Sequence, residues 1–344
     1  MSDFKQSQQM IDLIRQGAFC VSDGIVTLAN AEAQNRQITV GTTLSSLLTD
    51  HEEAYRGFQS GILYLTLSVA GTPYHATVTE IEEGHLFVLD SYHSTEALQA
   101  LSLASQHLRQ QMATVMAAAQ ENDSDSKLMK GLYRMQRMLC NMSDISAIRN
   151  KPAPAYMMEL GSAVYEITEK ASTLLAEAGI RVEYTGSNEP IHTAADYELL
   201  ERALYNLLSN AAKHCEKGSV LKIQLSRKNR VATITVEDDC CGIDSSLYST
   251  LFTSYLREPS LIDRQQGIGL GMALVQAVAA HHGGTVLVMR TKTGGTKVAL
   301  SIAITELDET IVRSPRKFLI DYAGELDHGL LELSDVLPTK LYNM

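Results

Sequence analysis

Apolar residues in the middle of the chain recur at the spacing of a helix. Residues 95–120 carry an apolar residue at nearly every third or fourth position, and residues 128–145 repeat the pattern after a polar break. Two long helices joined by a short polar turn predict an antiparallel hairpin. Because its apolar stripe is too long to be covered within one hairpin, we expect a symmetric homodimer that forms a four-helix bundle.

The pattern changes on either side of this hairpin. In residues 1–92, two short alternating runs flank the turn Asp23-Gly24, a helical piece follows, and three further strands are expected at 61–69, 72–81 and 85–89. Downstream, residues 200–211 and 272–280 predict helices, and the β-branched run from 231 predicts a strand entering a turn at Gly242. Residues 281–304 predict two strands joined at Gly294-Gly295.

These patterns divide the chain into four parts. We expect a small α/β unit at 1–92, the helical hairpin at 93–150, a larger α/β sandwich at 151–305 and an extension at 306–344. Pro152 and Pro154 mark the boundary after the hairpin. The fold class is therefore α+β multidomain, and the extension, although apolar enough at 330–336 to pack on something, has no assigned role.

Composition limits the partners. The 344 residues carry a net charge of −11 without basic clusters, which disfavours direct nucleic-acid binding. The longest mostly apolar stretch, 61–71, is too short to cross a bilayer, and the polar N-terminus lacks a signal-peptide core. We therefore expect a cytoplasmic protein without a membrane partner.

The five cysteines show no zinc-ligand spacing, and their number is odd. We expect reduced thiols, as is usual inside cells, with the adjacent Cys240 and Cys241 serving as packing residues.

Candidate chemistry gathers around GIGLGMALV at 267–275. Gly267, Gly269 and Gly271 alternate with apolar residues and lead into a helix, an arrangement that lets backbone amides approach a polyphosphate. In the earlier helix Asn206 and Asn210 share a face, and Lys213 lies about one turn further on. Amide oxygens and an ammonium suit a triphosphate that carries Mg²⁺.

The order and spacing of these pieces over 155–304 resemble the ATP-binding domain of sensor histidine kinases. That domain belongs to a superfamily shared with type II topoisomerases, mismatch-repair proteins and chaperone ATPases. NLLSNAAKH resembles the asparagine box, VEDDCCGI and GIGLGMALV the two glycine boxes, and LFTSY the phenylalanine box. The resemblance implies ATP and Mg²⁺ as cofactors.

It also implies roles for individual residues. Asn210 would bind Mg²⁺, and Asp238 would accept a hydrogen bond from adenine. Asn206, Lys213 and His214 would approach the phosphates or the ribose. The remaining positions implied for ATP binding are Gly242, Gly267, Gly269, Leu270, Gly271 and Thr296.

Two positions depart from relatives in informative ways. Relatives that hydrolyse ATP carry a glutamate base where this chain has Asn206, and an amide cannot deprotonate water, so simple ATP hydrolysis is disfavoured. Cys240 replaces a glycine that lies beside the adenine in the family, so we expect ATP binding to be weakened but not abolished.

The remaining parts fit the same family. The N-terminal unit is similar to a PAS sensory domain, and the hairpin resembles the dimerisation and phosphoacceptor domain. By that resemblance a response-regulator receiver domain would dock on the lower hairpin near Arg109.

The phosphoacceptor position leaves two alternatives open. The family motif is His-Glu-Leu-Arg-Thr-Pro-Leu, whereas this chain reads QHLRQQM, which places Gln106 at the acceptor position and His107 beside it. Either His107 has become the acceptor, although one residue along a helix rotates a side chain by about 100°. Or the acceptor is lost, and the chain is a degenerate kinase that acts as a non-enzymatic dimeric signalling or interaction module.

Overall fold

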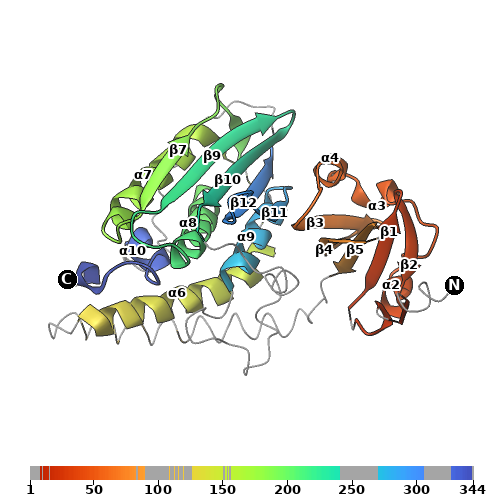
Figure 1. The fold of residues 1–344 in the computed structure, drawn as a ribbon, viewed down its shortest axis with the longest axis horizontal. Helices are drawn as coiled ribbons and strands as arrows, with labels where there is room; N and C mark the ends of the chain where they lie inside the picture. The colour runs from red at the N-terminus through yellow and green to blue at the C-terminus, as the bar shows by residue number, and fades with distance from the viewer. Residues whose placement is uncertain are drawn as a thin grey trace.

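The structure is a computed structural model, and its described part is dominated by one long sheet (Figure 1). It describes residues 8–9, 11–14, 16–82, 84–89, 108, 112, 115, 119, 126–149, 152, 154, 156–240, 270–305 and 327–342. The sheet has ten strands in the order β2-β1-β5-β4-β3-β11-β12-β10-β9-β7.

In its described part, the N-terminal unit contributes five of these strands, with short helices between the second and the third. They are β1 (Ala18–Ser22), β2 (Ile25–Ala29), α2 (Ala31–Asn35), α3 (Ser45–Leu48), α4 (Glu52–Arg56), β3 (Ile62–Val69), β4 (Thr72–Ile81) and β5 (Gly84–Leu89). The predicted hairpin turn is confirmed, since Asp23 and Gly24 have φ of 51° and 75°. The predicted order of strands and helices in this unit is observed as well.

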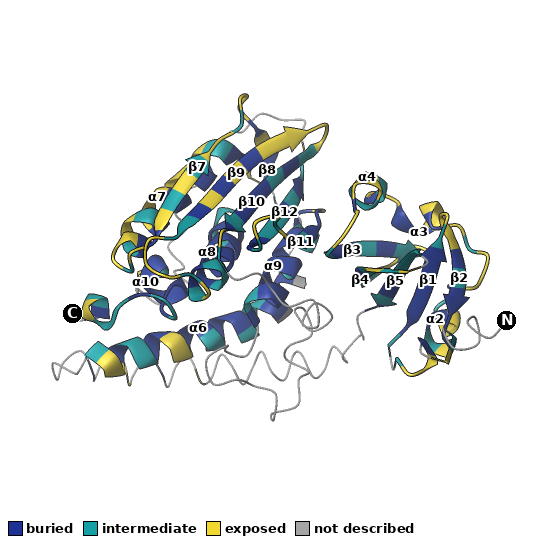
Figure 2. Cartoon of the chain, viewed as in Figure 1, coloured by how far each residue is buried: buried dark blue, intermediate teal, exposed yellow. Residues whose placement is uncertain are grey.

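The second unit is a five-stranded sheet with helices on one face. Its strands are β7 (Arg181–Thr185), β9 (Val220–Lys228), β10 (Val231–Asp238), β11 (Val286–Arg290) and β12 (Thr296–Ala303). Its helices are α7 (Leu160–Ala176), α8 (Tyr197–Lys213) and α9 (Leu270–His281), and a small sheet pairs β6 (Met157–Glu159) with β8 (His192–Ala194). Residues alternate between buried and exposed along β9, so the sheet has a covered and an uncovered face (Figure 2). The helices and strands predicted for this region are confirmed.

The second predicted hairpin helix is observed as α6 (Ser126–Arg149), which runs beneath the second unit (Figure 1). Its apolar stripe is divided between two surfaces: Leu132 and Leu139 are buried in the core shared with α8 and α9, whereas Leu128 and Met135 are each 52% exposed. Of the predicted first helix, the structure describes four residues, all helical: Leu108, Met112, Val115 and Ala119. Gln106 and His107 lie outside the described residues.

The two units share their sheet through a strand pair that the sequence did not predict. β3 pairs antiparallel with β11, with Leu63 opposite Leu287. Gly61 makes this approach possible, because a β-carbon there would lie 2.2 Å from the carbonyl oxygen of Val288. Its φ of 97° is also one that glycine adopts readily.

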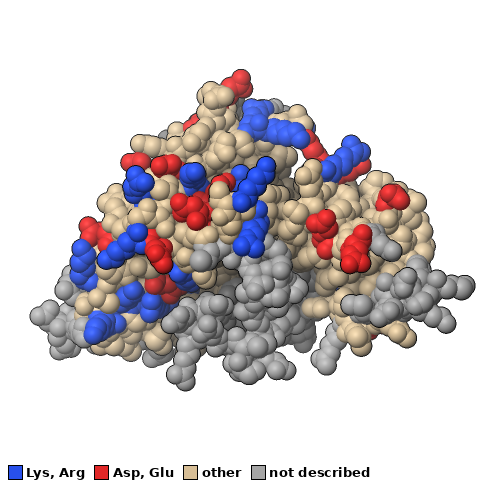
Figure 3. Space-filling view, viewed as in Figure 1, with Lys and Arg blue, Asp and Glu red and all other residues tan. Residues whose placement is uncertain are grey.

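The last described segment, residues 327–342, packs against α6, α7 and α8. It contains α10 (His328–Glu332) and a short 3₁₀ turn, η4 (Thr339–Tyr342). Leu331, Leu333 and Leu337 are fully buried, so the predicted packing of 330–336 is confirmed. Figure 3 shows acidic and basic side chains interspersed over one face of the second unit. Among the described helices, none has the length and apolar character that crossing a membrane requires.

Candidate functional site

Two asparagines lie on α8 where this helix meets α9. Asp196 caps the start of α8 by accepting a hydrogen bond from the amide of Leu199 at 3.3 Å. Asn206 is fully buried, and Asn210, one turn later, is half-buried. The predicted helix therefore presents both amides at one place.

The first turn of α9 lies against this asparagine pair. A β-carbon at Gly271 would lie 2.7 Å from Asn206 Oδ1 and 3.7 Å from Asn210 Nδ2, so only glycine fits without a shift. This arrangement brings the amides at the beginning of α9, which starts at Leu270, next to side-chain amides that suit Mg²⁺. The residues present therefore fit a magnesium polyphosphate. Gly242, Gly267 and Gly269, also predicted to bind ATP, lie outside the described residues.

Asp238 ends the strand β10 and is buried. Its Oδ1 accepts hydrogen bonds from the amides of Cys240 at 3.0 Å and Thr296 at 3.2 Å. Burial raises the pKa of Asp238 above its ordinary value, and the two amide hydrogen bonds oppose that shift. Fixed in this way, the carboxylate is suited to accept a hydrogen bond from the exocyclic amine of a base.

A disulfide corrects one sequence prediction. Cys215 and Cys240, expected to be reduced, are bonded to each other, with their Cα atoms 5.3 Å apart. The turn after β10 brings Cys240 to the end of α8, within the distance that a disulfide requires. Cys240 is therefore a cross-link and not the packing residue we expected. Cys20 and Cys140 are buried and form no disulfide within the described residues, as expected for reduced thiols.

Asn206 is held by residues that sequence analysis missed. Arg137 on α6 donates from Nη2 to Asn206 Oδ1 at 2.9 Å and from Nε to Glu332 Oε2 at 3.0 Å. Asn206 Nδ2 in turn donates to Glu332 Oε2 at 3.1 Å. The one local signal was a glutamate inside the apolar run 330–333, because a charge in such a run needs a partner when it is buried.

Lys213 also has a partner from the C-terminal segment. Its Nζ lies 2.6 Å from Asp335 Oδ2, which also accepts from Arg137 Nη1 at 2.7 Å. Burial alone would raise the pKa of Asp335, but the two cations outweigh burial and hold that pKa below its ordinary value. His214, the C-cap of α8, is exposed.

The structure thus brings the described candidates to two ends of one region. Asn206, Asn210, Gly271 and Lys213 form one end, and Asp238 with Thr296 forms the other. The disulfide between Cys215 and Cys240 connects the two ends, because it joins the residues that follow α8 and β10.

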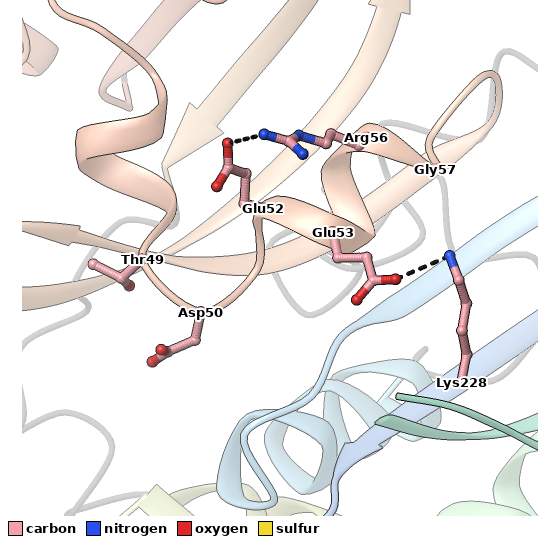
Figure 4. A pocket seen from close by; sticks show the side chains of 7 residues that line it. All are labelled: Thr49, Asp50, Glu52, Glu53, Arg56, Gly57 and Lys228. Carbon is pink, nitrogen blue, oxygen red and sulfur yellow. Dashed lines mark hydrogen bonds and ion pairs between the residues drawn. The ribbon is translucent and has the colours of Figure 1, made fainter. Parts of the chain in front are cut away.

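A hollow lies away from these residues, between α4 and the end of β9 (Figure 4). Glu52 faces Arg56 at 2.7 Å and Glu53 faces Lys228 at 3.0 Å, so these charges are paired with one another. The Glu53–Lys228 pair joins the two units at a second point beside the strand pair β3–β11.

A family profile and several known proteins match the part of the chain that contains the candidate site. A family profile described as "Histidine kinase-, DNA gyrase B-, and HSP90-like ATPase" matches residues 195–306, which include α8, β10 and α9. The sensor protein IrlS of Burkholderia pseudomallei is 30% identical over 155 residues, 44% of this chain and 33% of IrlS. The sensor protein RstB of Escherichia coli is 36% identical over 111 residues, 32% of this chain and 25% of RstB.

One solved structure is also similar to the chain. The crystal structure of full-length ShkA in complex with AMPPNP is 19% identical, with a TM-score of 0.49, and the match covers 61% of this chain and 47% of ShkA. The chain spans a third or less of the curated relatives described above. Its matched segment is a histidine kinase-type ATPase domain in a mixed α+β structure, and the relatives that it matches include sensor proteins and sensor histidine kinases.

Proposed function

We propose that this protein binds ATP with Mg²⁺ in the region between α8, α9 and the end of β10. The observation that carries the proposal is the close approach of Gly271 to Asn206 and Asn210, which leaves room for backbone but not for a side chain. Asn210 would hold Mg²⁺, the amides at the start of α9 would bind phosphate oxygens, and Lys213 would neutralise charge. Asp238 would accept from adenine.

The bound ATP would serve histidine autophosphorylation followed by transfer to a response regulator. Phosphoryl transfer depends mainly on positioning and charge neutralisation, which the named residues supply. His107 is the acceptor in this proposal. A homodimer would present it, and the exposed Leu128 and Met135 on α6 support that assembly because they offer an uncovered apolar row to a second copy.

The alternative function is that of a degenerate kinase, a dimeric interaction module without phosphotransfer. Gln106 at the acceptor position favours it. So does the engagement of Asn206 by Arg137 and Glu332, because an amide held in this way is not available to a substrate.

Two further parts of the proposal concern context. The N-terminal unit would act as a PAS-like sensor, which the order of a hairpin, short helices and three antiparallel strands supports. A cytoplasmic location is proposed from the sequence alone, and cell fractionation would test it.

Incubating the full chain with γ-labelled ATP and Mg²⁺ tests the function. We expect acid-labile label in the wild type and in Asn188→Ala, an exposed control, but not in His107→Ala or Asn210→Ala. Label that survives His107→Ala would place the acceptor elsewhere. ATP binding without any label would select the degenerate kinase, and failure of the wild type to bind ATP would refute the proposed ATP site and with it the kinase activity.

A further inference from the structure

Both the N–H donors and the oxygen of the Asn206 side chain are engaged by other residues of the chain. A side-chain amide has two N–H donors and an oxygen that can accept up to two hydrogen bonds. Here Oδ1 accepts from Arg137, while Nδ2 donates to the carbonyl of Arg202 at 2.9 Å and to Glu332 Oε2 at 3.1 Å. With no exposed surface, Asn206 offers nothing to a nucleotide in this arrangement.

Lys213 is also bound by a side chain, and this partner, Asp335, belongs to the same C-terminal segment as Glu332. Asp335 lies three residues after Glu332, so one short piece of chain delivers both carboxylates to the phosphate end. Carboxylates and phosphates are both recognised by cations through charge-assisted hydrogen bonds. Arg137 pairs with both carboxylates, and Arg202 pairs with Glu332 at 3.3 Å.

We propose that residues 327–342 are an internal ligand that keeps the phosphate end of the nucleotide site closed. In this state Glu332 and Asp335 hold Asn206 and Lys213, the groups that would otherwise contact the ATP phosphates. The segment must withdraw before Lys213 and Asn206 can contact a terminal phosphate. This inference rests on the proposed ATP binding and names its regulation.

The contacts of the segment show what would release it. Arg134 on α6 donates to the carbonyls of Ser334 at 3.2 Å and Asp335 at 2.9 Å, and Lys130 donates to the carbonyl of Leu337. The ring of Tyr133 lies 5.0 Å from that of Tyr342. Because α6 supplies most of the partners of residues 327–342, a shift of α6 relative to α8 breaks the contacts of this segment together. The second hairpin helix therefore controls whether the site is open.

The test measures ATP–Mg²⁺ affinity by calorimetry on the full chain and on two variants with the same charge. Asp335→Asn removes the partner of Lys213, and Asp335 is partly exposed at 29%, so the variant should fold. Asp144→Asn removes a carboxylate from the same cluster, but Asp144 pairs with Arg202 and lies on α6, outside the segment. We expect Asp335→Asn to bind ATP about tenfold more tightly, and Asp144→Asn to stay within about twofold of the wild type.

Hydrogen exchange supplies a readout that a general charge effect would not change. The amides of Leu331 and Leu333 bond within α10, to the carbonyls of Asp327 and Gly329, at 2.9 Å each. We expect added ATP to speed their exchange, because withdrawal exposes the segment.

Each other outcome overturns the proposal. Equal ATP affinity in the wild type and Asp335→Asn, with unchanged exchange, would refute closure while leaving ATP binding intact. An equal gain in ATP affinity in Asp335→Asn and Asp144→Asn would show that removing any negative charge from the cluster is enough, and would refute closure by the segment. If neither the wild type nor Asp335→Asn binds ATP, the proposed function fails, and the internal ligand fails with it.

Discussion

Asp238 and Asn206 occupy opposite ends of the candidate site, and different parts of the molecule hold them. Asp238 is fixed by two backbone amides that come from its own sheet and the turn that follows. Asn206 is fixed by the side chains of Arg137 and Glu332, from α6 and α10. Backbone amides of a sheet move little, whereas two packed helices can separate. The base end is therefore preformed, and the phosphate end depends on the position of its neighbours.

Replacing Arg137 should have the largest effect, because it removes the side chain that holds the phosphate end in place. Arg137→Ala removes one of the two guanidinium partners of Glu332, which has no exposed surface, and breaking such a buried pair costs up to about 3–5 kcal/mol. Denaturant unfolding would measure the loss. Arg134→Ala, at a position 48% exposed, is the control and should cost less than about 1 kcal/mol. Equal losses in the two variants would mean that the Arg137 network adds no stability.

Removing the disulfide that joins the two ends should have the next largest effect. Its sequence separation is 25 residues, and a loop of that length predicts a loss of about 3 kcal/mol in Cys215→Ser. Unfolding with and without a thiol reductant provides the matched control. Reductant should lower the stability of the wild type to that of the variant and leave the variant unchanged. A wild type that does not respond to reductant would contradict the cross-link.

Asp238→Asn should weaken ATP binding at the base end without lowering the stability of the fold. Loss of a hydrogen bond to a charged acceptor costs about 1.5–3 kcal/mol, so ATP affinity should fall by about 10- to 100-fold. The folded-state pKa of Asp238 is raised by burial, so its ionisation costs stability as pH rises through that pKa. Asparagine removes this cost and keeps an oxygen for the two amides. The melting temperature at pH 7 should therefore not fall.

Two measurements check this last prediction. Calorimetry gives the affinity, and thermal unfolding at pH 4 and pH 7 gives the stability. The difference in melting temperature between the variant and the wild type should be larger, in favour of the variant, at pH 7 than at pH 4. A variant that loses stability at pH 7 would show that the charge of Asp238 stabilises the fold, contrary to the burial argument.

The sequence predicted the features that depend on nearby residues and missed the contacts that join distant segments. Helical spacing located α8 and α9, alternation located β10, and both placed Asp238 at a strand end and the two asparagines on one face. These features depend on neighbours a few residues away. The contacts of Arg137 with Asn206 and of Lys213 with Asp335 join distant segments, and nothing in the local pattern of either partner identifies the other.

The cross-link and the strand pair β3–β11 were missed for a related reason. Cys215 and Cys240 have no spacing that distinguishes a disulfide from two free thiols. β3 could be recognised as a strand from its composition, but a strand has two edges, and its sequence does not specify which strand will pair with each. Only Gly61, whose lack of a side chain admits Val288, bears on that choice.

The strand pair β3–β11 also affects how safely the two units can separate. While they are joined, β3 is bonded to β4 along its length and to β11 at residues 62–64, and the strands at the ends of the sheet are β2 and β7. Separation would free the edge of β3 at residues 62–64 as well, in a strand whose run ILYLTLSV is rich in the residues that favour intermolecular pairing. A movement that parted the units would therefore expose the protein to aggregation. A signal that leaves the pair intact must turn both units as one body.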